Sequence, residues 1–227
     1  MGIDLAASSG TTAVVAVTWP RAGDSLPTVS GQWSGTTDGA ILDIIDVVRP
    51  VVIAIDAPLS LPAPLLAALC ADRFAVDTSD SSPYTRAAER DPLWSTLGVR
   101  PFPVSFLGGL TFRAIVLARR IVQKHPQTAV IETFPSGVLA ALGIRRGQRG
   151  RHPRDRKTSV ESRKATQQAL IDYIALPDAS SDLYSADTLD AIAAALAARA
   201  YAEGDFLSAG SVDEGQIILP RARLPLG

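Results

Sequence analysis

The stretch Val51-Val52-Ile53-Ala54-Ile55-Asp56 is a continuous apolar run that ends in a carboxylate. Unbroken β-branched runs of this kind are typical of a central strand that is buried on both faces of a sheet. The preceding segment, 38–48, has apolar residues at helical spacing, and Pro50 ends it. A strand that is reached through a helix usually runs parallel to its neighbour. The sequence therefore predicts an α/β protein with a parallel strand at 51–55.

Three strands are expected before this element, at residues 2–7, 12–19 and 28–33, and the short turns between them favour antiparallel pairing. After the central strand, the sequence predicts helices at 108–124, 136–142, 160–174 and 185–202, a strand at 128–132, and a short strand or docking segment at 216–219. Arranged around the first strand, these elements give a mixed five-stranded sheet with strand order 3-2-1-4-5, flanked by helices. We expect one domain over residues 1–227.

Residues 57–127 separate the fourth predicted strand from the fifth. Within them, residues 72–103 are polar, rich in Ser, Arg, Asp and Pro, and only weakly periodic. This stretch is longer than an ordinary loop. We therefore expect a large insertion or lid with a functional role.

Five carboxylates lie at predicted strand ends or on one helix face: Asp4, Asp56, Glu132, Asp187 and Asp190. A carboxylate is costly to bury alone, so we expect these groups to converge on a positive partner, for which a divalent metal ion is the usual choice. Each also has a plainer interpretation as a cap, a turn residue or a charge near a helix terminus. The combination favours a shared partner, because Asp187 and Asp190 are three residues apart on an otherwise apolar helix.

Composition excludes several function classes. The chain has 227 residues, 47% of them hydrophobic and 20% charged, which suits a folded core, and its net charge of −1 gives no overall basic footprint. One cysteine excludes an internal disulfide, and two histidines cannot make a zinc site by themselves. No signal segment or membrane-spanning apolar run is evident, so we expect a cytoplasmic protein with no membrane partner. The sequence specifies no oligomeric state.

Five short motifs occur in order: Gly2-Ile3-Asp4-Leu5-Ala6, Ile55-Asp56-Ala57-Pro58-Leu59-Ser60-Leu61-Pro62, Ile131-Glu132-Thr133-Phe134-Pro135, Asp187-Thr188-Leu189-Asp190-Ala191 and Glu214-Gly215-Gln216-Ile217-Ile218-Leu219-Pro220. As an ordered set they resemble domain of unknown function family 429, described as predicted nucleases of ribonuclease H fold. The resemblance runs nearly from end to end and implies that fold and a nuclease activity. Arg86-Ala87-Ala88-Glu89-Arg90-Asp91 resembles the arginine- and acid-containing stretch of the family's insertion. Ala186 stands where many relatives have a histidine.

In this interpretation the five acids are candidate catalytic residues that bind one or two Mg²⁺ or Mn²⁺ ions. Such ions would hold a scissile phosphate, activate water and stabilise the leaving oxygen. Asp4 is expected to bridge the ions, with Asp56 and Asp190 completing the metal shells. Glu132 and Asp187 are expected to be further ligands or to orient water.

Basic residues are the candidates for contacts with substrate phosphate. The densest positive stretch, 145–157, contains Arg146, Arg149 and Lys157, while Arg86, Arg90 and Arg113 lie in the insertion. A solvated loop is the alternative for 145–157. Aromatic residues make up only 6% of the chain, so a base-stacking platform is not evident, and any nucleic acid is expected to bind through its backbone.

Two other function classes stay open. Asp4 followed by Ser8-Ser9-Gly10-Thr11-Thr12 loosely resembles the first phosphate-binding hairpin of actin-like ATPases and sugar kinases, so a small-molecule phosphotransferase is the second candidate. A catalytically silent binding protein of the same fold is the third. Phosphate transfer from ATP without cleavage of nucleic acid would favour the second, and an Asp4 substitution without effect would favour the third.

Overall fold

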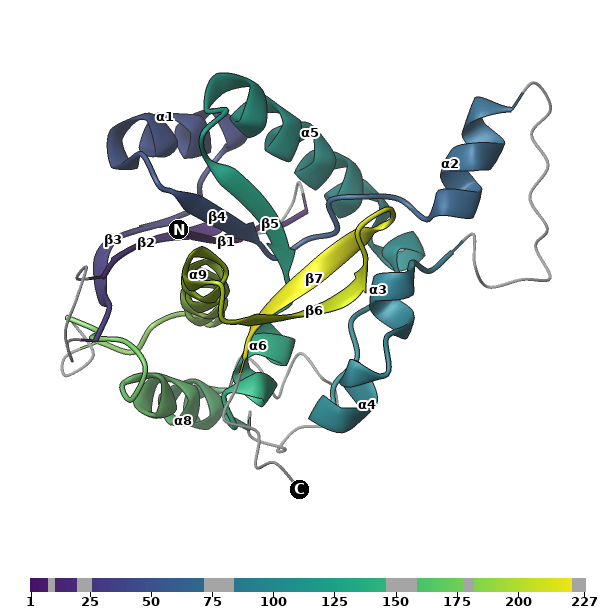
Figure 1. Ribbon diagram of the computed structural model, residues 1–227. Coiled ribbons are helices and arrows are strands. Elements are labelled where there is room, and N and C mark those ends of the chain that lie inside the picture. The colour runs from purple at the N-terminus through teal and green to yellow at the C-terminus, as the bar shows by residue number, and fades with distance from the viewer. Residues whose placement is uncertain (8–10, 20–25, 72–83, 146–158, 178–181, 222–227) are drawn as a thin grey trace.

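The computed structural model describes residues 1–7, 11–19, 26–71, 84–145, 159–177 and 182–221, and its described strands form one mixed sheet (Figure 1). The strands are β1 (Gly2–Asp4), β2 (Ala13–Thr18), β3 (Thr28–Ser34), β4 (Val52–Ile55), β5 (Ala129–Thr133), β6 (Phe206–Ser211) and β7 (Gly215–Pro220). They lie in the order β3-β2-β1-β4-β5-β7-β6. Strands β1, β4, β5 and β7 pair in parallel, whereas β2, β3 and β6 pair antiparallel with their neighbours. The carboxyl ends of β1 and β4 therefore meet at one edge of the sheet.

The predicted strand order 3-2-1-4-5 is present, but the prediction of a five-stranded sheet was wrong, because the hairpin of β6 and β7 adds two strands beside β5. The segment predicted at 216–219 is the core of β7, where Ile217, Ile218 and Leu219 are buried. Strand β6 is an edge strand in which only Ala209 is buried, so its sequence carries little hydrophobic pattern. That weak pattern explains why β6 was not predicted.

Helices cover both faces of the sheet. They are α1 (Asp38–Val48), α2 (Ala63–Cys70), α3 (Ala87–Arg90), α4 (Leu93–Leu97), the 3₁₀ helix η1 (Val104–Leu107), α5 (Gly108–Lys124), α6 (Pro135–Ala141), α8 (Val160–Leu170) and α9 (Ala186–Glu203). Helices α1 and α5 lie on one face and α9 on the other, with α6 and α8 beyond α9 (Figure 1). Apolar side chains of α1 and α5, such as Ile41 and Leu117, pack on Ile3 and Ile55 of the central strands.

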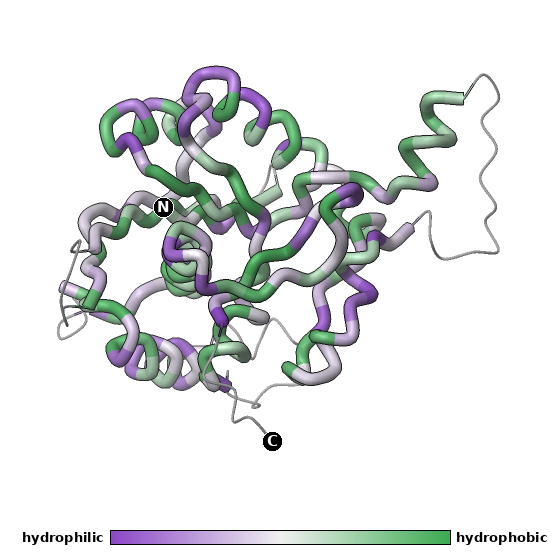
Figure 2. Tube along the Cα trace, in the orientation of Figure 1, coloured by the Kyte–Doolittle hydropathy of each residue, from purple (hydrophilic) through white to green (hydrophobic). Residues whose placement is uncertain are grey.

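Helix α9 lies unusually close to strand β1. A Cβ atom added to Gly2 would lie 2.0 Å from the carbonyl oxygen of Ala191 and 2.3 Å from the amide nitrogen of Ala195. Only a glycine on the strand, facing alanines on the helix, permits this approach. Figure 2 shows α9 as a largely hydrophobic tube in the middle of the molecule, as expected of a helix that is buried all round.

Strand β1 is shorter than the predicted 2–7 and ends at Asp4. Beyond it, the amide of Ala6 donates to Oγ1 of Thr12 at 3.2 Å, and the carbonyl of Ala6 accepts from the guanidinium of Arg113. Side chains thus take the backbone groups that a longer strand would have paired. Asp4 consequently lies at the strand end.

The insertion contains more regular structure than predicted, because its described residues form α2, α3, α4 and η1 in addition to the predicted helix at 108–124, which is α5. The helix predicted at 160–174 ends at Leu170, after which Ala175 exchanges backbone hydrogen bonds with Pro27 and Val29 beside β3. Among the described residues, no helix is long and apolar enough to cross a membrane.

Candidate metal centre

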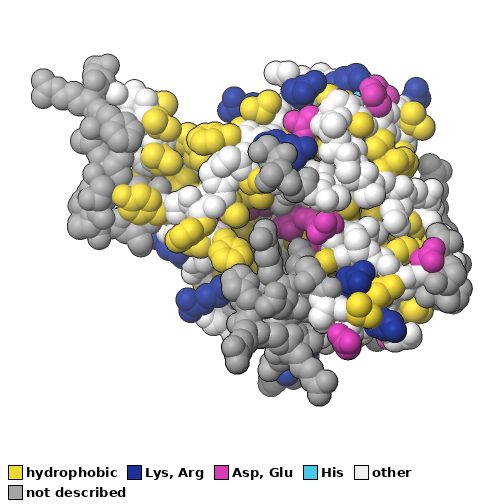
Figure 3. Space-filling model, turned by 180° about the vertical axis from the view of Figure 1, so that it is seen from behind, with side chains coloured by type: hydrophobic (Ala, Val, Ile, Leu, Met, Phe, Trp, Pro, Cys, Tyr) yellow, Lys and Arg dark blue, Asp and Glu magenta, His cyan; other side chains and the backbone are white. Residues whose placement is uncertain are grey.

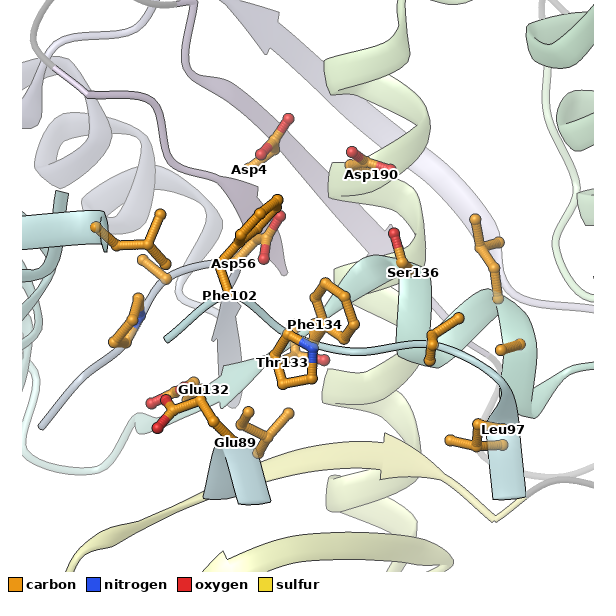
Figure 4. A pocket seen from close by; sticks show the side chains of 18 of the residues that line it. Asp4, Asp56, Glu89, Leu97, Phe102, Glu132, Thr133, Phe134, Ser136 and Asp190 are labelled. Atoms are coloured by element: carbon orange, nitrogen blue, oxygen red, sulfur yellow. The ribbon is translucent and has the colours of Figure 1, made fainter. Parts of the chain in front are cut away.

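Three of the predicted acids come together at the sheet edge. Asp4, Asp56 and Asp190 each offer one carboxylate oxygen, and these oxygens all lie within 4.8 Å of one another. Asp190 is buried, while Asp4 and Asp56 are partly exposed. Figure 4 shows the three side chains at the top of the pocket, with Asp4 and Asp190 facing each other.

The fold dictates this meeting. Ile3 of β1 pairs with Ile55 of β4, and the amide of Asp56 donates to the carbonyl of Ile3 at 2.8 Å. Asp4 and Asp56 are the next residues along these parallel strands, so their side chains leave the same edge. Asp190 is in the second turn of α9, directly before the residue that touches Gly2. The close helix packing therefore brings the third carboxylate to the other two.

The oxygens fit a hard divalent cation. Mg²⁺ prefers oxygen ligands at about 2.0–2.1 Å, so two ligands of one ion are at most about 4.2 Å apart, and Ca²⁺ allows about 5 Å. Separations of up to 4.8 Å lie within the limit for Ca²⁺ and exceed the limit for Mg²⁺, so the side chains would have to move closer together to hold one Mg²⁺ ion.

Glu132 has a different partner from the one predicted. Its two carboxylate oxygens accept from Arg86, at 2.7 Å from Nη1 and 2.6 Å from Nη2, and Oε2 also accepts from the amide of Leu59 at 2.8 Å. Figure 4 shows Glu132 beside Glu89 and away from the three aspartates. Glu132 lines the same pocket, but among the described residues it is not in the group that could hold an ion.

Arg86 is fully buried, and all of its guanidinium N–H groups donate to acceptors within the protein. It also donates to Oε1 of Glu89 through Nε and Nη2, and to Oγ of Ser60 through Nη1. The predicted contact of Arg86 with a substrate phosphate therefore has no free donor in this structure. Burial would lower the pKa of the guanidinium, but Glu132 and Glu89 raise it above its ordinary value. Burial raises the pKa of the Glu132 carboxyl, and Arg86 opposes that rise.

Glu214, in the turn between β6 and β7, fastens the insertion to the sheet. Its carboxylate accepts from the amide of Ala63, at 2.7 Å, and from the amide of Ala87, at 2.5 Å. Both amides belong to first residues of helices, α2 and α3, which have no partner within their own helix. The carbonyl of Glu214 also accepts from Ser60 at 2.6 Å. Glu214 opens the last of the five ordered motifs, but its contacts with Ala63 and Ala87 were not predicted from the sequence.

The other predicted residues are placed as follows. Asp187 is partly exposed in the first turn of α9, outside the three-aspartate group, where its charge suits the helix N-terminus. Arg90 is exposed. Arg113 is paired with Asp38 at 2.7 Å and holds the backbone after β1. Arg146, Arg149 and Lys157 lie outside the described residues.

The hairpin behind the phosphotransferase alternative is described only in part. Residues 8–10 lie outside the described residues, and Thr12 is buried. Its hydroxyl lies 3.2 Å from the amide of Ala6, as a hydrogen-bond acceptor, and 3.2 Å from Nη1 of Arg113. This hydroxyl is therefore engaged within the fold and gives no support to a phosphate contact.

The three aspartates line a cleft of about 1230 Å³, whose lining also includes Phe102, Phe106, Ser136 and Arg145. Figure 3 shows acidic side chains in a hollow on the far side of the molecule, with hydrophobic side chains beside them. Phe102 and Phe106 are 64% and 80% exposed. Neither was predicted from the sequence, although both lie in a segment without helical or strand period, and Phe102 stands between two prolines, which marks them as poor core candidates.

A scan of protein families matches residues 2–214 to the family described as Protein of unknown function (DUF429). The chain is a member of the DUF429 family. Searches of the curated proteins and of the solved structures found no match. The family assignment drawn from the ordered motifs is thus confirmed. The function of this DUF429 protein has to be argued from its own site.

Proposed function

We propose that this DUF429 protein is a metal-dependent nuclease of ribonuclease H-like fold, with Asp4, Asp56 and Asp190 as the ligands of Mg²⁺ or Mn²⁺. The meeting of three carboxylate oxygens within 4.8 Å at the end of two parallel strands carries the proposal. The strand order β3-β2-β1-β4-β5 around β1 supports the fold assignment.

A cation bound there would supply the positive charge that holds a phosphate and makes water a stronger nucleophile. The residues of the chain would do the rest. Asp4 and Asp56, at the ends of the neighbouring strands β1 and β4, would hold the cation from the sheet, and Asp190 would hold it from helix α9. Arg145 is exposed in the lining of the same cleft, where its charge would attract the phosphate backbone of a nucleic acid.

Metal binding and cleavage can be tested together with one matched control. Mn²⁺ binding is measured by calorimetry, and cleavage of single-stranded, duplex, hybrid and branched nucleic acids is measured with Mg²⁺ or Mn²⁺ and with a chelator. We expect Asp4→Asn and Asp190→Asn to lose Mn²⁺ binding and to lower the cleavage rate by more than about 100-fold. Substituting residues that only hydrogen-bond to metal ligands already lowers metal affinity or activity by about 10- to 100-fold.

Asp187→Asn is the control, because it removes the same charge from the same helix, outside the three-aspartate group. It should keep both properties. Cleavage that survives in Asp4→Asn, or is lost equally in Asp187→Asn, would reject the proposed site. Crystals soaked in Mn²⁺ should show anomalous density between the three aspartates.

A further inference from the structure

The cleft carries two exposed aromatic rings that the packing of the protein does not explain. Phe102 is 64% exposed and Phe106 is 80% exposed, and within the described residues neither ring belongs to a hydrophobic core cluster. By contrast, Phe134, which lines the same cleft, packs edge-on against Trp94 with ring centroids 5.8 Å apart. The two exposed rings therefore face the cleft without packing in a hydrophobic core cluster of the described residues.

The segment that carries the rings is fixed to the protein at several points. Val104, between the two phenylalanines, is buried. The amide of Ser105 donates to the carbonyl of Tyr84 at 3.4 Å, and the amide of Phe106 donates to the carbonyl of Pro103 at 3.0 Å. Prolines restrict the backbone on both sides of Phe102. A ring held on such a backbone loses little freedom when it binds a flat partner.

The rings and the aspartates face the same space. Both phenylalanines line the cleft that contains Asp4, Asp56 and Asp190, and Figure 4 shows the Phe102 ring in front of the Asp56 side chain. A nucleic acid whose phosphate lies at the aspartates would have its bases within the same cleft. Stacking on aromatic side chains suits every base, because every base has a π-face.

We propose that Phe102 and Phe106 form a stacking site for unpaired nucleobases beside the three-aspartate cluster, so that the substrate is a single-stranded nucleic acid. This inference rests on the proposed nuclease function and narrows its substrate. Bases of an intact duplex are already stacked within the helix and cannot reach the rings without being flipped out.

The test measures affinity for labelled oligonucleotides of about 12 nucleotides in Ca²⁺, which binds carboxylates, with cleavage rates in Mg²⁺ measured alongside. Phe102→Ala and Phe106→Ala should each raise the Kd of the single strand by about 5- to 150-fold, the usual range for a stacked base. Phe102→Trp should keep the affinity. Phe112→Ala should also keep it, because Phe112 is 61% exposed on α5 and is not part of the cleft lining.

An abasic strand and a duplex show whether the rings recognise bases. The abasic strand should bind wild type more weakly, and Phe102→Ala should weaken it no further. Duplex affinity should not change in either variant. Equal losses for normal and abasic strands, a loss in Phe112→Ala as large as in Phe102→Ala, or a change below about 2-fold in both cleft variants would overturn the stacking site.

The outcomes separate this inference from the nuclease proposal. If wild type cleaves nucleic acid, Asp4→Asn does not, and both phenylalanine variants bind as wild type does, the stacking site is rejected and the nuclease stands. If wild type neither binds nor cleaves any nucleic acid, both fail. ATP with Mg²⁺ is titrated in parallel: a loss of ATP affinity in the phenylalanine variants without a loss for the single strand would reject the single-stranded substrate and favour the phosphotransferase.

Discussion

Replacing Arg86 by Met removes a fully buried cation that serves two carboxylates. Arg86 contacts Glu132 at 2.6 and 2.7 Å and Glu89 at 2.5 and 2.8 Å, and Ser60 loses a donor as well. Removing one partner of a buried ion pair costs about 3–5 kcal/mol, because the other charge stays buried without compensation. With two carboxylates left behind, we expect a loss of about 5 kcal/mol in the free energy of unfolding.

Urea unfolding, with the slope of the transition checked for constancy, measures this loss directly. For a chain of this size each kcal/mol shifts Tm by about 2–4 °C, so Tm should fall by about 10–20 °C. Arg90→Met is the control: Arg90 is exposed, its Nε lies 3.4 Å from the carbonyl of Arg86, and the change should cost less than about 0.5 kcal/mol. If both variants lose the same stability, the buried cluster does not hold the insertion as described.

The pH dependence of this stability loss tests whether the buried carboxylate of Glu132 causes it. Burial already raises the pKa of Glu132, and without Arg86 that pKa rises further. A group whose pKa is raised in the folded state contributes stability at low pH and loses it as the pH rises through that folded pKa. The deficit of Arg86→Met relative to wild type should therefore shrink as the pH falls from about 8 to about 5. A deficit that stays constant across this range would refute the role given to Glu132.

Two further predictions concern close packing and the anchor of the insertion. Gly2→Ala should lower the free energy of unfolding by about 3 kcal/mol and weaken Mn²⁺ binding, because the added Cβ would lie 2.0 Å from the backbone of α9. The control is Gly39→Ala in α1, where the nearest atom is 3.9 Å away, and this change should be neutral or stabilising in the same unfolding assay. Glu214→Ala leaves the amides of Ala63 and Ala87 without their acceptor. Limited proteolysis should then cut within residues 57–107 faster, by about 10-fold for a local loss near 1.4 kcal/mol, while an unchanged rate would contradict the anchor.

The sequence predicts the centre of the fold well because its signals are local. A carboxylate after a buried apolar run marks a strand end, and parallel neighbours place such ends at one edge, as happens for Asp4 and Asp56. The alanine-rich helix with Asp190 could also be predicted, since a helix that is apolar all round is a buried helix. Glu132 gives the same local signal as the two strand aspartates, yet it faces Arg86 instead. The register gives the reason: β5 continues to Thr133, and Glu132 is level with Ile55, one residue before Asp56, so it does not stand at the strand end beside the two aspartates.

The insertion was predicted as a segment, but its contacts could not be predicted because they join residues far apart in the chain. Arg86 lies 46 residues from Glu132, and Glu214 lies 151 residues from Ala63, so no periodic pattern connects them. Composition also hid the exposed aromatic rings. The aromatic content of 6% is an average over the whole chain, whereas a stacking site needs only a few rings in one cleft.

The two parts of the molecule contribute different things to the cleft. Backbone pairing and close packing of α9 hold the three aspartates, whereas the insertion carries the exposed rings. Glu132 joins the two parts, because it accepts from Arg86 of the insertion and from the amide of Leu59, three residues after Asp56. A buried ion pair of this kind contributes little stability compared with an apolar replacement, but it fixes orientation. Under the proposed function, this pair would help to set the distance between a base stacked on the insertion and a phosphate at the sheet edge, because the carbonyl of Tyr84, two residues before Arg86, accepts from the amide of Ser105 in the segment that carries the rings.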